Sequence, residues 1–271
     1  MHSPWGDEVV AGEYAGHPGL VYRQRPRTFA DLLFGVQRWG RRTFLVQGDR
    51  RINFADFFAA VPEARERLAR IGVKPGDRVA LLAYNGPDWV LALWAIWAAG
   101  AVPVLGNRWW SGKEADHSLA LIHPRAVITD AAELVAGYGA PVIPISALRD
   151  CFGGESFDAP AIPGPADEES QAVTLFTSGS TGMPKAVELP FRSVVANQQN
   201  VLARSRQLPH LLPLDGVQAV SLVSTPLFHI GAFATLITQT ITGGRIVFNV
   251  GRFDPQQVLT LIESERVERW G

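Results

Sequence analysis

The sequence predicts an α/β fold in which largely parallel sheets are flanked by helices. The prediction rests first on the stretch Trp89–Leu105, which carries no charged residue and is divided by Gly100 and Pro103. A buried helix, a glycine cap and a buried strand account for this pattern, whereas a membrane span would be continuous. It rests second on other short apolar runs that follow glycine- or proline-containing turns. Helices and strands that alternate in this way are typical of parallel sheets.

The first elements follow one another in a regular order. An amphipathic helix is expected to open at Ile52–Phe58 and to run to about Ile71, where Gly72 ends it. Pro75–Asp77 then makes a turn into a strand over Arg78–Leu82. This succession of helix, turn and strand is the start of an α/β arrangement.

The remaining elements continue the alternation. Asn85 follows the strand just described, and the buried helix then runs to Ala99 and leads into a strand over 101–105. Further strands are expected over 173–176 and 219–224, where apolar residues cluster. We find no internal repeat in the chain.

The stretch Thr177–Lys185 packs four hydroxyls, two glycines and one lysine into nine residues directly after the strand predicted over 173–176. Glycines let the backbone turn sharply and approach a ligand closely. Backbone N–H groups, hydroxyls and an ammonium group together suit phosphate oxygens. A Ser/Gly-rich linker is the alternative, but a linker requires neither a preceding strand nor a Pro-Lys end. The stretch therefore predicts a phosphate-binding loop.

A histidine stands in a second distinctive segment, Thr225–Ala232, which follows the strand predicted over 219–224. An isolated histidine among apolar residues is usually a hydrogen-bonded core residue. In a chain that also carries a phosphate loop, we interpret His229 as a functional residue. No cysteine or second histidine stands at ligand spacing, so no metal site is expected. The neighbouring tryptophans Trp109 and Trp110 fit either core packing or a substrate or interface role.

Thr177–Lys185 resembles the phosphate-binding loop of the adenylate-forming enzymes, which include acyl-CoA synthetases, firefly luciferases and adenylation domains of peptide synthetases. The usual pattern is Thr-Ser-Gly-Ser-Thr-Gly-x-Pro-Lys-Gly, from which this chain departs at Ala186. Alanine keeps the loop only if its φ is negative or mild strain is tolerated, so a reshaped loop end is an open alternative. Pro184 distinguishes the stretch from P-loop NTPases, whose pattern has a glycine before the lysine.

Other segments resemble the same superfamily, and the resemblance runs from roughly Phe29 to Trp270. Thr225–Ala232 is similar to its Pro-Leu-Phe-His-x-x-Gly segment. Trp109–Glu114 resembles a Trp-Trp-Thr-Gly-x-Glu segment of some bacterial fatty-acyl-CoA ligases. Phe253–Pro255 resembles a Phe-Asp-Pro segment that precedes a helix.

The resemblance implies the first part of the large N-terminal domain of an ATP-dependent acyl-CoA ligase. Such an enzyme activates a carboxylic acid as an acyl-adenylate and transfers the acyl group to a thiol, with ATP, Mg²⁺ and coenzyme A as cofactors. A fatty or other apolar acid is favoured over an amino acid. As the catalytic residue, His229 would position the acyl carboxylate or gate its tunnel. Gly179 and Gly182 would permit the turn of the loop, and the phosphates would be held by Thr177, Ser178, Ser180, Thr181 and Lys185.

The stretch Ala159–Asp167 is rich in Pro, Ala and Gly and reads as a surface connection before the strand that leads into the phosphate loop. We therefore expect two α/β portions, 1–165 with an N-terminal extension and 166–271 with the phosphate loop. The family's adenine, ribose and hinge segments and its lysine-bearing C-terminal domain find no match here. We therefore expect the front part of such an enzyme, truncated at its C-terminal end and unable to complete acyl-adenylate formation alone. The alternative is a noncatalytic phosphate-binding or assembly module, and self-association through the truncated edge is a further expectation.

The composition is that of a packed globular protein, with 47% hydrophobic and 19% charged residues. A formal net charge of −1 gives no electrostatic reason to bind nucleic acid or an anionic membrane. The single Cys151 excludes an internal disulfide and fits the reducing cytoplasm. No basic segment followed by an apolar core opens the chain, so we expect neither a secretory signal nor a transmembrane segment.

Overall fold

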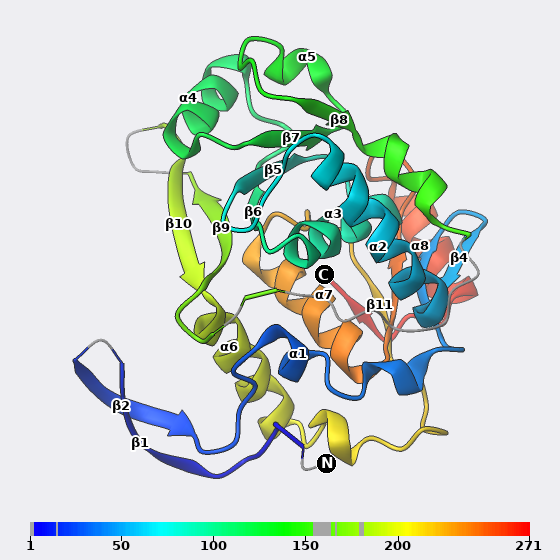
Figure 1. Cartoon of the computed structure of the whole chain (residues 1–271). Helices are drawn as coiled ribbons and strands as arrows, with labels where there is room; N and C mark the ends of the chain where they lie inside the picture. Colours follow the sequence, from blue (N-terminus) through cyan, green and yellow to red (C-terminus); the bar gives the residue numbers. More distant parts are fainter. Residues whose placement is uncertain (1–2, 15, 154–163, 166, 179–181) are drawn as a thin grey trace.

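The structure is a computed structural model, which describes residues 3–14, 16–153, 164–165, 167–178 and 182–271. Two larger sheets and a separate hairpin hold the described strands (Figure 1). The first sheet has the order β10-β9-β6-β5-β7-β8. Its strands are β5 (Arg78–Leu82), β6 (Val102–Leu105), β7 (Ala126–Thr129), β8 (Val142–Pro144), β9 (Gln171–Thr177) and β10 (Lys185–Pro190).

The second sheet has the order β13-β11-β12-β3-β4. Neighbouring strands in both sheets are parallel, except that β10 runs antiparallel to β9 and β4 antiparallel to β3. The strands of the second sheet and of the hairpin are β3 (Thr43–Gln47), β4 (Arg50–Asn53), β11 (Val220–Leu222), β12 (Arg245–Phe248), β13 (Arg269–Trp270), β1 (Val9–Tyr14) and β2 (His17–Tyr22). The predicted α/β fold with largely parallel sheets is confirmed.

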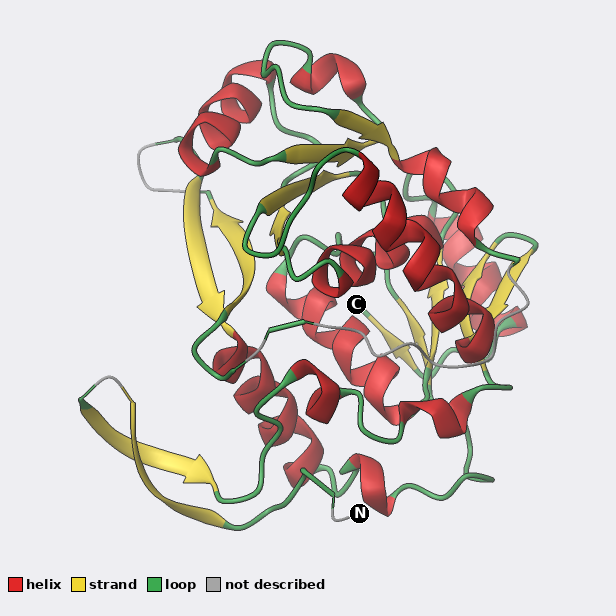
Figure 2. Ribbon diagram, viewed as in Figure 1, coloured by secondary structure: helices red, strands yellow, loops and turns green. Residues whose placement is uncertain are grey.

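Helices pack on the faces of these sheets (Figure 2). They are α1 (Phe29–Leu32), α2 (Phe54–Arg70), α3 (Pro87–Ala98), α4 (Gly112–Ile122), α5 (Ala132–Val135), α6 (Phe191–Arg204), α7 (Ile230–Thr242) and α8 (Pro255–Ser264). Short 3₁₀ turns are η1 (Val36–Trp39), η2 (Ile145–Cys151) and η3 (Pro209–Leu211). One apolar cluster joins α2, α3, α6 and α7 to strands of both larger sheets. A second, smaller cluster holds α4 and α5 on the opposite face of the first sheet. A third cluster holds α8 on the opposite face of the second sheet.

Strand β5 shows how the sequence divides these clusters. Val79 and Leu81 face the large cluster, whereas Ala80 and Leu82 face the cluster under α4. Successive side chains of a strand point to opposite faces, and a parallel strand covered on both sides is apolar throughout. The first sheet is therefore buried on both faces at this strand.

Helix α3 is the uncharged helix expected after Trp89, and it begins two residues earlier. Every residue from Pro87 to Ala98 is buried, which identifies α3 as a core helix. Its one charged residue, Asp88, pairs with Arg50 at 2.7 Å and with Arg149 at 3.3 Å. Within the described ranges, no helix is long and apolar enough to cross a membrane.

The predicted start of the preceding helix is wrong by two residues. Ile52 and Asn53 belong to strand β4, and helix α2 begins at Phe54. Asn53 is the N-cap, because its Oδ1 accepts a hydrogen bond from the amide of Asp56 at 2.7 Å. The end of the helix agrees with the prediction, since Gly72 adopts a φ of 82°.

The two larger sheets draw strands from both sides of the boundary predicted at residues 165 and 166. Strands β9 and β10 join the first sheet, although they follow that position in the chain. Strands β3 and β4 join the second sheet, although they precede it. The division into 1–165 and 166–271 stays a prediction, and the sheets do not follow it.

Candidate functional site

The carboxyl ends of the parallel strands in the two sheets meet at Gln47. This residue ends β3, and its Nε2 donates to the carbonyl of Asn85 at 3.2 Å and to that of Asn249 at 3.1 Å. Asn85 follows β5 in the first sheet, whereas Asn249 follows β12 in the second. One side chain thus ties together the two edges at which ligands bind in open α/β sheets.

Asn85 fixes the segment that carries the predicted histidine. Its Nδ2 donates to the carbonyl of Thr225 at 2.9 Å, and its Oδ1 accepts from the amide of Leu227 at 2.8 Å. These two bonds join the first sheet to the turn that precedes His229. The role of Asn85 is not predicted from the sequence, where the available signal is an asparagine just beyond the end of a strand.

His229 is exposed and stands at the N-cap position of α7, with φ −88° and ψ 140°. Its ring lies 4.5 Å from that of Phe228, which is buried. Within the described residues, the imidazole makes no hydrogen bond to another group. His229 is therefore not the buried, hydrogen-bonded core histidine that was the alternative. It is exposed at the start of α7.

The predicted phosphate loop connects β9 to β10 in an antiparallel hairpin. Thr177 ends β9 and Lys185 begins β10, and the two residues are partners in the strand register. Both are exposed, as are Ser178 and Gly182. Gly182 has a φ of 81°, a conformation that favours glycine. The predicted residues Gly179, Ser180 and Thr181 lie outside the described residues.

Ala186, where the loop pattern departs from the usual glycine, lies inside β10. Its register partner is Phe176, and it packs half-buried against the cluster under α4. The described non-glycine residues with positive φ are His123, Arg206 and Arg266, so Ala186 carries no left-handed strain. Alanine is compatible with this backbone, and it adds a methyl group to an apolar contact.

The paired tryptophans have different environments. Trp110 is 8% exposed and meets Phe176 edge to face, with centroids 4.8 Å apart. Trp109 is 57% exposed and lies 5.8 Å from Phe228 and 5.7 Å from Tyr84. Trp110 is thus a core residue, whereas Trp109 presents an aromatic surface. Together they connect the strand before the phosphate loop to the segment before His229.

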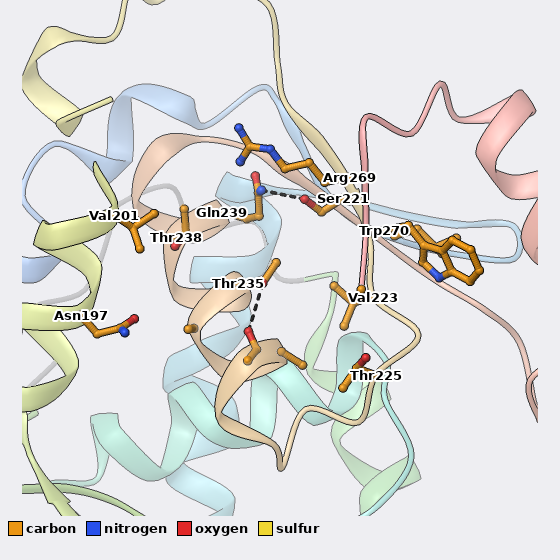
Figure 3. Close-up of a pocket in the computed structure, with 15 residues that line it drawn as sticks. Asn197, Val201, Ser221, Val223, Thr225, Thr235, Thr238, Gln239, Arg269 and Trp270 are labelled. Carbon is orange, nitrogen blue, oxygen red and sulfur yellow. Dashed lines mark hydrogen bonds between the residues drawn. The ribbon is translucent and has the colours of Figure 1, made fainter. Parts of the chain in front are cut away.

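A cavity of about 420 Å³ lies along α7, between α6 and the strands β11 and β13 (Figure 3). Thr225 and Gly231 line the end next to His229, and Thr238 and Gln239 line the other end. The rise of an α-helix separates these two ends by about 12 Å. Most of the lining is apolar or small, with Val201, Leu222, Val223, Ala232 and Ala234 among the residues that form it.

Two polar side chains at the far end of the cavity each donate one hydrogen bond. Nε2 of Gln239 donates to the hydroxyl of Ser221 at 2.8 Å, a bond drawn in Figure 3. The hydroxyl of Thr238 donates to Oε1 of Gln198 at 2.5 Å. The cavity can hold an elongated group along α7, and the buried Oε1 of Gln239, a residue at its far end, has no hydrogen-bond partner among the described residues.

No group of three or more His, Cys, Asp or Glu side chains among the described residues could hold a metal ion. We therefore assign no protein ligand to magnesium. Thr177 and Lys185 suit the phosphate end of a nucleotide, because an exposed hydroxyl and an ammonium group flank the same hairpin turn.

Comparison with known proteins supports this interpretation. A family model described as AMP-binding enzyme matches residues 35–270. A feruloyl-CoA synthase of an Amycolatopsis species is 33% identical over 233 residues, which cover 83% of this chain and 44% of that protein. A medium/long-chain-fatty-acid–CoA ligase of Mycobacterium tuberculosis is 28% identical over 257 residues, with coverages of 87% and 41%. The chain thus spans less than half the length of these relatives.

Solved structures show the same fold. The o-succinylbenzoate–CoA synthetase of Bacillus subtilis in complex with AMP matches with a TM-score of 0.72 and 26% identity, over 88% of this chain and 60% of that chain. The N-terminal subdomain of Klebsiella oxytoca NpsA matches with a TM-score of 0.73 and 22% identity, over 90% and 59%. The predicted likeness to the N-terminal domain of adenylate-forming enzymes is confirmed. Because the family model covers far more than half of the chain, this protein belongs to the family of AMP-binding enzymes.

Proposed function

We propose that this chain forms the phosphate-binding and acid-binding part of an ATP-dependent acyl-CoA ligase. The main support is the placement of Thr177 and Lys185 on either side of the β9–β10 turn, on the carboxyl edge of the first sheet. Through Phe176 and the tandem tryptophans, this hairpin is connected to the segment that carries His229. The phosphate loop and the segment that carries His229 are thus distant in sequence but connected through contacts between aromatic side chains.

The proposed chemistry assigns a role to each side chain. Negative charge builds up on phosphate oxygens when a carboxylate displaces pyrophosphate from ATP, and preset donors stabilise that charge. The Lys185 ammonium and the hydroxyls of Thr177 and Ser178 would bind these oxygens. Gly182 would let the backbone turn close to them, and Ser180, Thr181 and Gly179 would complete the loop. His229 would orient the carboxylate of the acid as it enters the site.

The cavity along α7 supports an acid with an apolar body. Its lining is mainly apolar, and Thr225 and Gly231, which flank His229 in the chain, line its near end. The relatives are named for ferulate, 2-succinylbenzoate and fatty acids, all of which are carboxylic acids. We propose a fatty or other apolar carboxylic acid as the substrate class, with Mg²⁺ held by phosphate oxygens and coenzyme A as acyl acceptor.

A cytoplasmic location and self-association belong to the same proposal. The free Cys151 is buried and fits a reducing compartment. Strand β13 is an edge of the second sheet, and its Trp270 is exposed. Exposed strand edges and apolar side chains favour association with another chain. Light scattering over a range of concentrations tests this part, and a monomer at every concentration would contradict it.

Titration calorimetry with pyrophosphate, ATP and adenosine tests the proposed function. We expect weak binding of pyrophosphate and ATP, because the hydrogen-bond donors of the hairpin turn would bind phosphate oxygens. We expect adenosine, which has no phosphate, to bind more weakly than either. Adenosine binding as tight as ATP, with no heat from pyrophosphate, would contradict the proposed role of the hairpin.

A further inference from the structure

Helix α4 contacts the turn of the β9–β10 hairpin, which carries the predicted phosphate loop, through one histidine. Nε2 of His117 lies 3.2 Å from the carbonyl oxygen of Pro184, the residue directly before Lys185. A carbonyl oxygen can only accept, so Nε2 carries the hydrogen and donates it. Proline has no N–H, which leaves this carbonyl as its one hydrogen-bonding group in the backbone. The bond therefore fixes the backbone position from which the Lys185 side chain starts.

A residue just before α4 contacts the other end of the β9–β10 turn. Trp110 meets Phe176 edge to face at 4.8 Å, and Phe176 directly precedes Thr177. Trp110 thus lies against the end of β9, and His117 bonds the residue just before β10, so both sides of the turn are contacted. A turn whose two ends are both fixed loses less conformational freedom when a ligand binds, which favours affinity.

Helix α4 is itself fixed at its start. Ser111 accepts from the amide of Glu114 at 3.3 Å, while Oε2 of Glu114 accepts from the amide of Ser111 at 2.8 Å. This capping box sets where the helix begins, and the hydrogen bonds from the backbone and side chain of Ser111 lower the pKa of Glu114. His117 follows one turn after the box. The helix can therefore act as a rigid support for the hairpin.

We infer that His117 is a positioning residue, which holds the Lys185 end of the β9–β10 hairpin in the conformation that binds phosphate. Its effect on affinity rests on the proposed function, whereas its effect on the hairpin does not. A neutral and a protonated imidazole both carry the Nε2 hydrogen when the neutral form is this tautomer, so the contact can persist in both states.

Three variants test the inference. His117→Ala removes the donor, and His117→Gln returns an N–H donor on a side chain of similar reach. His210→Ala is the matched control, because His210 is also exposed but bonds Ser3, far from the hairpin in the chain. We expect His117→Ala to weaken pyrophosphate binding by about three- to tenfold, from the size of one hydrogen bond. We expect His117→Gln to recover affinity to within about twofold, and His210→Ala to match wild type.

Amide hydrogen exchange provides a second measurement that needs no ligand. We expect peptides covering Met183–Pro190 to exchange faster in His117→Ala, with the thermal midpoint close to that of wild type. His117→Gln and His210→Ala should exchange like wild type over these residues. Unchanged exchange in His117→Ala would overturn the inference, as would a failure of His117→Gln to restore what His117→Ala loses.

The two measurements separate the inference from the proposed function. If wild type does not bind pyrophosphate, the proposed function fails, and amide exchange alone decides the role of His117. If Lys185→Ala weakens pyrophosphate binding but His117→Ala leaves both binding and exchange unchanged, the proposed function stands and the role of His117 is wrong.

Discussion

Trp109 lies edge-on against Phe228, with ring centroids 5.8 Å apart and ring planes inclined by 60°. Trp109 follows a strand of the first sheet, whereas Phe228 directly precedes His229 in a segment that follows the second sheet. An exposed tryptophan that is held in this way can support its neighbour without contributing much to the core. Its expected role is local order at His229.

We predict that Trp109→Ala loosens the Phe228–His229 segment while the fold stays intact. An aromatic pair contributes about 0.5–1.5 kcal/mol beyond its area, and most of the Trp109 side chain is exposed, so the loss of unfolding free energy should be small. Amide exchange of peptides containing His229 should increase. Trp109→Phe keeps an aromatic ring and should restore protection; faster exchange in both variants, or in neither, would contradict this role.

The double hydrogen bond of Asn85 predicts a larger effect on stability. Asn85→Ala removes the donor to Thr225 and the acceptor for Leu227, so we expect a loss of about 1–3 kcal/mol in the free energy of unfolding. Denaturant titration measures this loss. Asn200→Ala serves as the control, because Asn200 is exposed and its side chain accepts a hydrogen bond from Tyr22 as its one partner among the described residues. A loss for Asn85→Ala no larger than that of the control would show that the two hydrogen bonds of Asn85 are not formed in solution.

Glu265 predicts how stability depends on pH. Hydrogen bonds from Arg51 lower the pKa of Glu265 below its ordinary value of 4.5, partly offset by burial, and the charges of Arg51 and Arg245 act in the same direction as the bonds. A pKa lowered by folding contributes stability above the unfolded value, and this contribution is lost as the pH falls through the folded value. Wild type should therefore lose stability on acidification below about pH 4.5 more steeply than Glu265→Gln.

Unfolding curves of both proteins between pH 7 and pH 3 measure this difference. The gap between wild type and Glu265→Gln should change with pH only in the acidic part of that range. A gap that stays constant down to pH 3 would mean that folding does not lower the pKa of Glu265.

Local patterns in the sequence were sufficient for the elements that local chemistry decides. Helix α3 could be predicted from its lack of charge and β9 from its apolar run, because a segment that is buried in the core is apolar and carries few charges. Strand β10 was missed, because its exposed residues, including Glu188 and Val187, show no apolar face. The start of α2 was misplaced, because Asn53 both ends a strand and caps a helix.

The candidate site could be predicted only in part, because some of its residues act through contacts to residues that are distant in the chain. Thr177, Lys185 and His229 belong to contiguous motifs that can be read from the sequence. Gln47 and Asn85 act through backbone carbonyls of residues that are distant in the chain, so their roles appear only when the two sheets meet. His117 and Pro184 are likewise 67 positions apart, and no local pattern predicts that they touch.

Calorimetric titration of pyrophosphate into wild type, Lys185→Ala and Lys74→Ala tests the central claim most directly. Lys74 is an exposed lysine just before β5, at the opposite end of that strand from the candidate site, and its replacement removes the same charge. Loss of one charge-assisted contact, about 1.5–3 kcal/mol, should weaken binding by about tenfold or more in Lys185→Ala. Lys74→Ala should bind like wild type. Equal pyrophosphate affinity in wild type and Lys185→Ala would contradict the assignment of this hairpin as the phosphate-binding loop.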